Sequence, residues 1–84
     1  MNARIALEHF VEAFCKGKQI DVKNGFYTNL DNAITAGLTD KKKRDSIAGL
    51  YSFASKIVHG QIESNTRNTQ YAVNGIINIL DTIG

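Results

Sequence analysis

The sequence predicts an all-α fold, a small bundle of about four helices in a single domain that spans residues 1–84. Three observations predict this class. Apolar residues recur at the three-four spacing of a helix face in four separate segments. Proline is absent from the 84 residues. Glycine and asparagine supply the turns between the segments, which favours helices joined by short connections.

The first helix is expected from about residue 2 to residue 16, followed by a loop over residues 18–27. Gly17 is expected to end this helix in the way that glycine usually ends helices. Asn24-Gly25 is a turn signal, but its flanks are too short for the strands of a hairpin. The core residues assigned here are Leu7, Phe10, Val11 and Phe14 on the helix and Ile20, Val22 and Phe26 in the loop.

Three further helices follow the loop. The second is expected to start with Thr28 or Asn29 as its cap and to stop near Gly37. Thr39 or Asp40 is expected to cap the third, which ends at His59-Gly60. The fourth is expected over residues 66–83. The apolar stripe of the third helix comprises Ile47, Leu50, Tyr51, Ala54 and Val58, widened by Phe53 and Ile57; that of the fourth comprises Ala72, Ile76, Ile79, Leu80 and Ile83.

The composition limits the class of protein. A chain of 84 residues forms one small domain of modest stability, and a homodimer is one way for such a domain to gain core. The single cysteine, Cys15, forms no disulfide within the chain, which favours a reducing, cytoplasmic location. No apolar run reaches the roughly 20 residues of a membrane span, and residues 1–8 lack the core of a signal peptide.

Few residues suggest chemistry. The sequence has no Cys/His cluster at metal-ligand spacing and no Gly-rich phosphate loop, so neither a metal nor a cofactor is expected. His9 is expected to be a partly exposed histidine rather than a catalytic one. The run Lys41, Lys42, Lys43 and Arg44 is read as a solvated basic face, with phosphate contacts to RNA or DNA as the alternative. The net charge of +2 neither points strongly to nucleic acid nor excludes it.

His59 is the main candidate for catalysis. It stands at a predicted helix C-terminus, where the helix dipole favours the imidazolium. That placement suits general acid-base work on a phosphodiester, and it equally suits a residue that only caps the helix. Physical chemistry alone favours the cap.

The stretch GLYSFASKIVHG resembles the signature of the HEPN superfamily (higher eukaryotes and prokaryotes nucleotide-binding domains), above all its abortive-infection and Apea-like branches. That signature is an arginine, a polar residue, three or more further residues and a histidine, usually followed by glycine, at the end of a long helix. Ser55 stands at the polar position, His59 and Gly60 stand at its end, and Tyr51 is typical. The closing segment NTQYAVNGIINILDTI resembles the family's last helix. The resemblance implies a HEPN-like bundle and covers about residues 39–83.

The resemblance also implies an activity, with one departure. In active HEPN ribonucleases the arginine and histidine of two protomers face each other across a dimer cleft. Spacing places the motif arginine at position 54, where this chain has Ala54. By analogy His59 would act as acid or base, Ser55 would support it, and the basic run would help to hold RNA during metal-independent cleavage by 2′-hydroxyl attack. Lacking the arginine, this chain is predicted to be inactive or nearly so.

Three explanations of Ala54 stay open: a substitution that silences a ribonuclease, a natural loss that leaves a binding module, or a small core residue in a chain outside the family. The partners implied by the resemblance are RNA, a second copy of the chain, and an antitoxin or larger defence protein. A different class of function is a non-catalytic dimeric helical interaction module or regulator. A third is a direct nucleic-acid binder that uses the lysine run.

Overall fold

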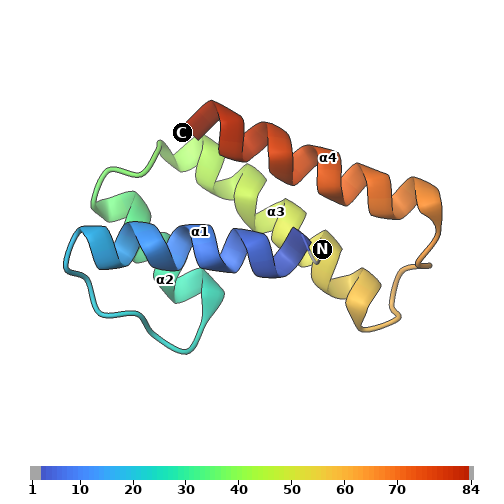
Figure 1. The fold of residues 1–84 in the computed structure, drawn as a ribbon, viewed down its shortest axis with the longest axis horizontal. Helices are drawn as coiled ribbons and strands as arrows, with labels where there is room; N and C mark the ends of the chain where they lie inside the picture. Colours follow the sequence, from blue (N-terminus) through green and yellow to red (C-terminus); the bar gives the residue numbers. More distant parts are fainter. Residues whose placement is uncertain (1–2, 84) are drawn as a thin grey trace.

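The computed structural model describes residues 3–83 as four α-helices, and these residues contain no strand, which confirms the all-α prediction. The helices are α1 (Ala3–Gly17), α2 (Phe26–Thr35), α3 (Lys41–Val58) and α4 (Thr66–Ile83). α1 packs mainly on α2, and α3 packs mainly on α4, while α1 also reaches α3 and α4. α4 runs back along α3, so the end of α4 lies near the start of α3 (Figure 1). No helix among the described residues is long and apolar enough to cross a membrane.

The core forms where the predicted apolar faces of the four helices meet. Leu7 and Val11 of α1 are fully buried, as predicted, and Phe10 and Phe14 pack at the margin of the core. The buried apolar residues are Leu7, Val11, Cys15, Leu30, Ala33, Ile47, Ala54, Ala72 and Ile76. The prediction that Val58 belongs to the core is wrong, because its side chain is 50% exposed. Val58 is the last residue of α3, where that helix extends past the start of α1 (Figure 1).

The prediction that Thr28 or Asn29 begins the second helix is also wrong. α2 starts at Phe26, with Gly25 as an N-cap that makes no side-chain capping bond. Asn29 turns inward instead, and its side-chain amide accepts from the backbone N–H of Lys23 at 2.7 Å and donates to the Lys23 carbonyl at 3.0 Å. Asn29 is 3% exposed. A buried polar group needs hydrogen-bond partners, and the Asn29 amide finds them in the backbone of the loop that precedes α2.

The helix ends show which residue takes the left-handed conformation. Gly37 and Gly60 have φ of 99° and 75° and follow the C-cap residues of α2 and α3, as expected for glycine at this position. Gly17 does not play this part, because it is the last residue of α1, and Gln19 has the positive φ of 59°. The Ile20 N–H donates to the Cys15 carbonyl at 2.9 Å, so the closing hydrogen bond still forms. Asp40 caps α3 as predicted and accepts from the Lys43 N–H at 2.8 Å.

Candidate functional site

His59 is the C-cap residue of α3, and its side chain is exposed. Its backbone N–H donates to the carbonyl of Ser55 at 2.9 Å. Because α-helical residues four apart lie about 40° apart around the axis, Ser55 and His59 share one side of the helix. The prediction that His59 ends the helix is confirmed, and the imidazole is open to solvent.

Ala54 lies in the core, with a side chain that is 6% exposed. Five residues separate it from His59, which places the two about 140° apart around α3. Its helical position falls between Leu50 and Tyr51, two residues that face the neighbouring helices. Ala54 is therefore a small residue in the centre of the bundle, and His59 lies on a different face of the same helix.

The basic run does not form one continuous patch. Arg44 donates to Asp31 of α2 at 2.8 Å and to Asp45 at 3.4 Å. The hydrogen bond to Asp31 is the first cause of a raised Arg44 pKa. Lys41 lines the same hollow as Asp31 and Arg44, whereas Lys43 lines a hollow beside α4.

Successive residues of a helix point about 100° apart, so four consecutive cations surround α3 rather than track along one side. The four cationic side chains are also accompanied by three carboxylates, of Asp31, Asp40 and Asp45. Within this run, the positive charge that has no ion pair belongs to the three lysines, of which Lys41 and Lys42 are exposed and Lys43 is half-buried.

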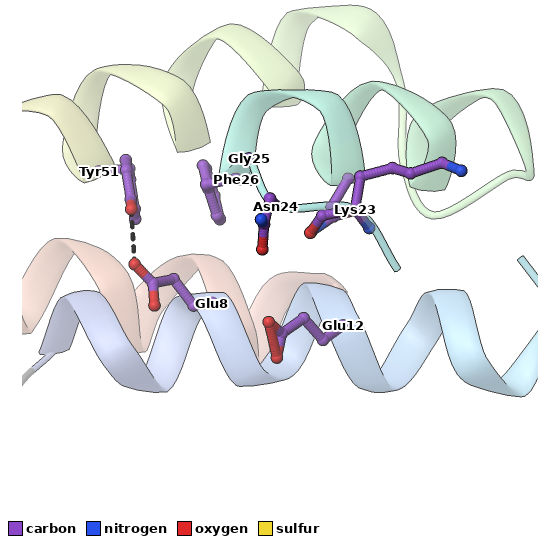
Figure 2. A pocket seen from close by; sticks show the side chains of 8 residues that line it. Glu8, Glu12, Lys23, Asn24, Gly25, Phe26 and Tyr51 are labelled. Atoms are coloured by element: carbon purple, nitrogen blue, oxygen red, sulfur yellow. Dashed lines mark hydrogen bonds between the residues drawn. The ribbon is translucent and has the colours of Figure 1, made fainter. Parts of the chain in front are cut away.

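A polar pocket of about 170 Å³ lies between α1, α3 and the start of α2, and sequence reasoning missed it. Tyr51 donates a hydrogen bond to a carboxylate oxygen of Glu8 at 2.6 Å (Figure 2). The ring of Phe26 stacks on that of Tyr51, with centroids 3.8 Å apart and planes 7° apart. Burial, followed by the bond to Glu8, raises the pKa of Tyr51 to about 12. Tyr51 is therefore a hydrogen-bond donor at neutral pH and not a base.

The carboxylates at this pocket have a structural explanation. Glu8 and Glu12 lie one turn apart on α1, facing the beginning of α2, while the side chain of Lys23 extends away from them (Figure 2). α2 lacks a side-chain cap, and negative charge near a helix N-terminus stabilises the helix dipole. Forty-three residues separate Glu8 from Tyr51, so no local pattern could have indicated their contact.

The largest hollow that we describe is a groove of about 650 Å³ between α3 and α4. Its eight lining residues are all uncharged: Ser46, Gly49, Leu50, Phe53, Tyr71, Asn74, Gly75 and Asn78. Tyr71 packs edge-on against Phe53, with ring centroids 5.2 Å apart, yet it is 62% exposed. Ile77, also on α4, is 44% exposed. The outer side of α4 thus presents apolar surface next to an uncharged groove.

The described residues hold no group of three or more metal-ligating side chains. Cys15, the free thiol, is buried against the carbonyl of Asn29 at 3.5 Å. Burial, together with the charge of Glu12, raises the pKa of Cys15, so this thiol is a core group and not a nucleophile.

Comparison with known proteins adds no relative. No protein-family model matches the chain, and no curated protein or solved structure matches it significantly.

Proposed function

We propose that this chain is a non-catalytic helical interaction module that binds a partner through the outer side of α4. The observation that carries the proposal is the exposure of Tyr71, which lines the uncharged groove between α3 and α4, together with the exposure of Ile77 on the same helix. Large apolar side chains that gather on one exposed side, with polar residues around them, are typical of protein-binding surfaces.

The placement of the catalytic candidates supports a binding role over catalysis. A ribonuclease of the type considered above needs a cation that holds the phosphate near the histidine. Position 54, where the motif arginine would stand, is occupied by a buried alanine on another face of α3. His59 has Ser55 beside it on the helix, and no side-chain hydrogen bond from another described residue orients either group for proton transfer.

Two measurements test the proposal. RNA incubated with the chain and a metal chelator should remain intact, and the His59→Ala variant should give the same result. Cleavage that the His59→Ala substitution abolishes would contradict a non-catalytic module.

The second measurement asks whether the apolar surface is needed for folding. Ile77→Lys should leave the free energy of unfolding within about 0.5 kcal/mol of wild type, since exposed positions tolerate such changes. A loss of several kcal/mol in urea unfolding would make Ile77 a core residue and remove the surface from the proposal.

The second candidate is a HEPN-like domain of a metal-independent endoribonuclease. In this proposal the domain is a homodimer that is inactive or nearly so because Ala54 replaces the motif arginine. The observation that favours it is the solvent-open imidazole of His59 one turn after Ser55. In this proposal RNA contacts the exposed lysines at the start of α3, and an antitoxin or larger defence protein controls the domain in the cytoplasm. Its test is cleavage by an Ala54→Arg variant, with circular dichroism to establish that the variant folds.

A further inference from the structure

We propose that the outer face of α4 binds α4 of a second copy of this chain, with the two helices antiparallel and the two-fold axis at Asn74. This inference rests on the proposed interaction module and names its partner. α4 lies at the margin of the bundle and packs on α3 and α1, which leaves its opposite side open (Figure 1). Ala72 and Ile76 point into the core, and Asn74, between them in sequence, points out.

Four exposed residues of α4 lie in two symmetric pairs about Asn74. Tyr71 and Ile77 lie three residues to either side of it, and Gln70 and Asn78 lie four residues to either side. An antiparallel pair centred on Asn74 brings each of these residues to the level of its counterpart on the other helix. Residues three, four and seven apart share one side of a helix, so these positions form one stripe.

The charges of α4 fit this arrangement. The helix carries two charged residues, Arg67 and Asp81, each seven residues from Asn74 and each exposed. Fourteen residues of helix span about 21 Å, and fourteen residues also return to nearly the same side of the helix. An antiparallel partner places Arg67 opposite Asp81 of the second copy at both ends of the interface. A parallel partner would place like charges together.

The helix dipole gives a second electrostatic argument. Arg67 lies in the first turn of α4 and Asp81 lies in the last turn, and each sign is the one that the helix's own dipole disfavours. In an antiparallel pair, Arg67 lies beside the C-terminus of the other helix and Asp81 lies beside its N-terminus. Both charges are then next to the dipole end that attracts them.

The middle of the stripe supplies self-complementary contacts. Asn74, Gln70 and Asn78 are primary amides, each of which is both donor and acceptor, so Asn74 can bond to Asn74 of the second copy and Gln70 to its Asn78. Tyr71 and Ile77 supply the apolar surface that the pair buries. One helix pair is smaller than a standard interface, so the dissociation constant is expected on the order of 10–500 µM.

Sedimentation equilibrium on the full chain, at low salt and up to about 1 mM, tests the association. Arg67→Asp alone or Asp81→Arg alone replaces two attractive pairs by two repulsive ones, so each should weaken the dimer about tenfold. The double variant Arg67→Asp/Asp81→Arg restores opposite charges and should return to within about threefold of wild type. Lys18→Asp, an equal change of charge on the α1 side, should leave the dissociation constant unchanged.

Disulfide cross-linking tests the orientation. In the antiparallel pair the two copies of Asn74 face each other at the axis, within reach of a disulfide, whereas the two copies of Asn78 are about 12 Å apart along the axis. Asn74→Cys should therefore form a covalent dimer on oxidation, and Asn78→Cys should not. Cross-linking of both variants would indicate parallel helices and overturn the proposal.

A wild-type chain that stays monomeric at 1 mM also overturns the proposal, because no second copy then binds α4. Single charge variants that associate as wild type does overturn it as well, because the dimer then forms without the Arg67–Asp81 contacts of paired α4 helices. Failure of the proposed function is a separate result, since His59-dependent RNA cleavage would reveal an enzyme whether or not the chain forms this dimer.

Discussion

The two sides of the bundle are held together by different kinds of contact. On the α2 side, directional bonds join the elements: Tyr51 donates to Glu8, Arg44 donates to Asp31, and Asn29 bonds the backbone of Lys23. On the α4 side, apolar packing joins α4 to α3, with Phe53 against Tyr71 and Leu50 over Gly75. Among the described residues, the side-chain hydrogen bonds of α4 stay local, as in Asn68 to Glu63 and Thr82 to Asn78.

The difference indicates how each side should respond to substitution. A directional bond is lost when one donor or acceptor is removed, even if the volume is kept. Apolar packing is insensitive to such changes but responds to changes of volume. The α2 side should therefore be sensitive to the loss of polar atoms, and the α4 side to the addition of carbon atoms.

The largest effect is expected at Ala54, whose position on α3 lies between the two sides. Ala54→Arg places a guanidinium in the core without a partner and should destabilise the protein by more than about 3 kcal/mol. Urea unfolding followed by circular dichroism measures the loss. Val58→Arg is the matched control on the same helix, since Val58 is half exposed and should tolerate arginine. Equal stability of the two variants would mean that position 54 opens to solvent.

The next effect is expected at Asn29. Asn29→Ala removes both bonds to the backbone of Lys23 and leaves those backbone groups unpaired, which should cost about 2–3 kcal/mol. Thermal and urea unfolding measure it. Asn32→Ala, on the same helix and without such bonds, should cost less than about 1 kcal/mol. A cost at Asn29 no larger than at Asn32 would remove the directional character that we assign to the α2 side.

Two glycines test the α4 side by volume. A Cβ at Gly75 would lie 2.7 Å from a methyl carbon of Leu50, whereas a Cβ at Gly49 would meet nothing within 4 Å. Gly49→Ala should stabilise the protein by about 0.5–1 kcal/mol through helix propensity. Gly75→Ala gains the same propensity but must displace Leu50, so it should be about 1 kcal/mol less favourable than Gly49→Ala. Equal gains for the two variants would show that α3 and α4 have room between them.

The last effect is expected at Tyr51, and it depends on pH. The pKa of Tyr51 is about 12 in the folded protein against 10.0 ordinarily, so folding favours the protonated phenol. This contribution is fully present below pH 10 and is lost as the pH rises from 10 to 12.

Tyr51→Phe removes the bond to Glu8 and should cost about 1 kcal/mol at pH 8, with a smaller cost at pH 11. Urea unfolding at the two pH values measures the difference. Tyr27→Phe, which keeps that bond, should follow the pH dependence of wild type. A Tyr51→Phe cost that does not change between pH 8 and pH 11 would contradict the raised pKa.

Periodicity predicted the helices well and their ends less well. The start of α2 was misplaced because Asn29 resembles an N-cap in the sequence, yet its amide bonds to Lys23, six residues before it. The end of α1 lies within one residue of its predicted place, but Gln19 and not Gly17 takes the left-handed conformation. Asn29 and Gly17 are residue types that often stand at helix ends. Whether they take that role here depends on contacts with other parts of the chain.

The candidate sites also include features that local sequence signals predict and features that depend on distant residues. The position of His59 at a helix end and the cap formed by Asp40 follow from local signals, and the structure confirms both. The ion pair of Arg44 with Asp31 joins residues 13 positions apart, and the hydrogen bond of Tyr51 to Glu8 joins residues 43 positions apart. No pattern within one helix contains that information.

The sequence by itself determined the fold class, the number of helices and most of the residues that face the core, because spacing along one helix decides which side is apolar. It also determined the order of charges and amides along α4. Only the tertiary structure decided that Ala54 is enclosed, that the Asn29 amide bonds to the backbone of Lys23, and that the stripe of α4 around Asn74 faces outward. These depend on which helix lies against which, and that arrangement is the result of all four apolar faces being buried together.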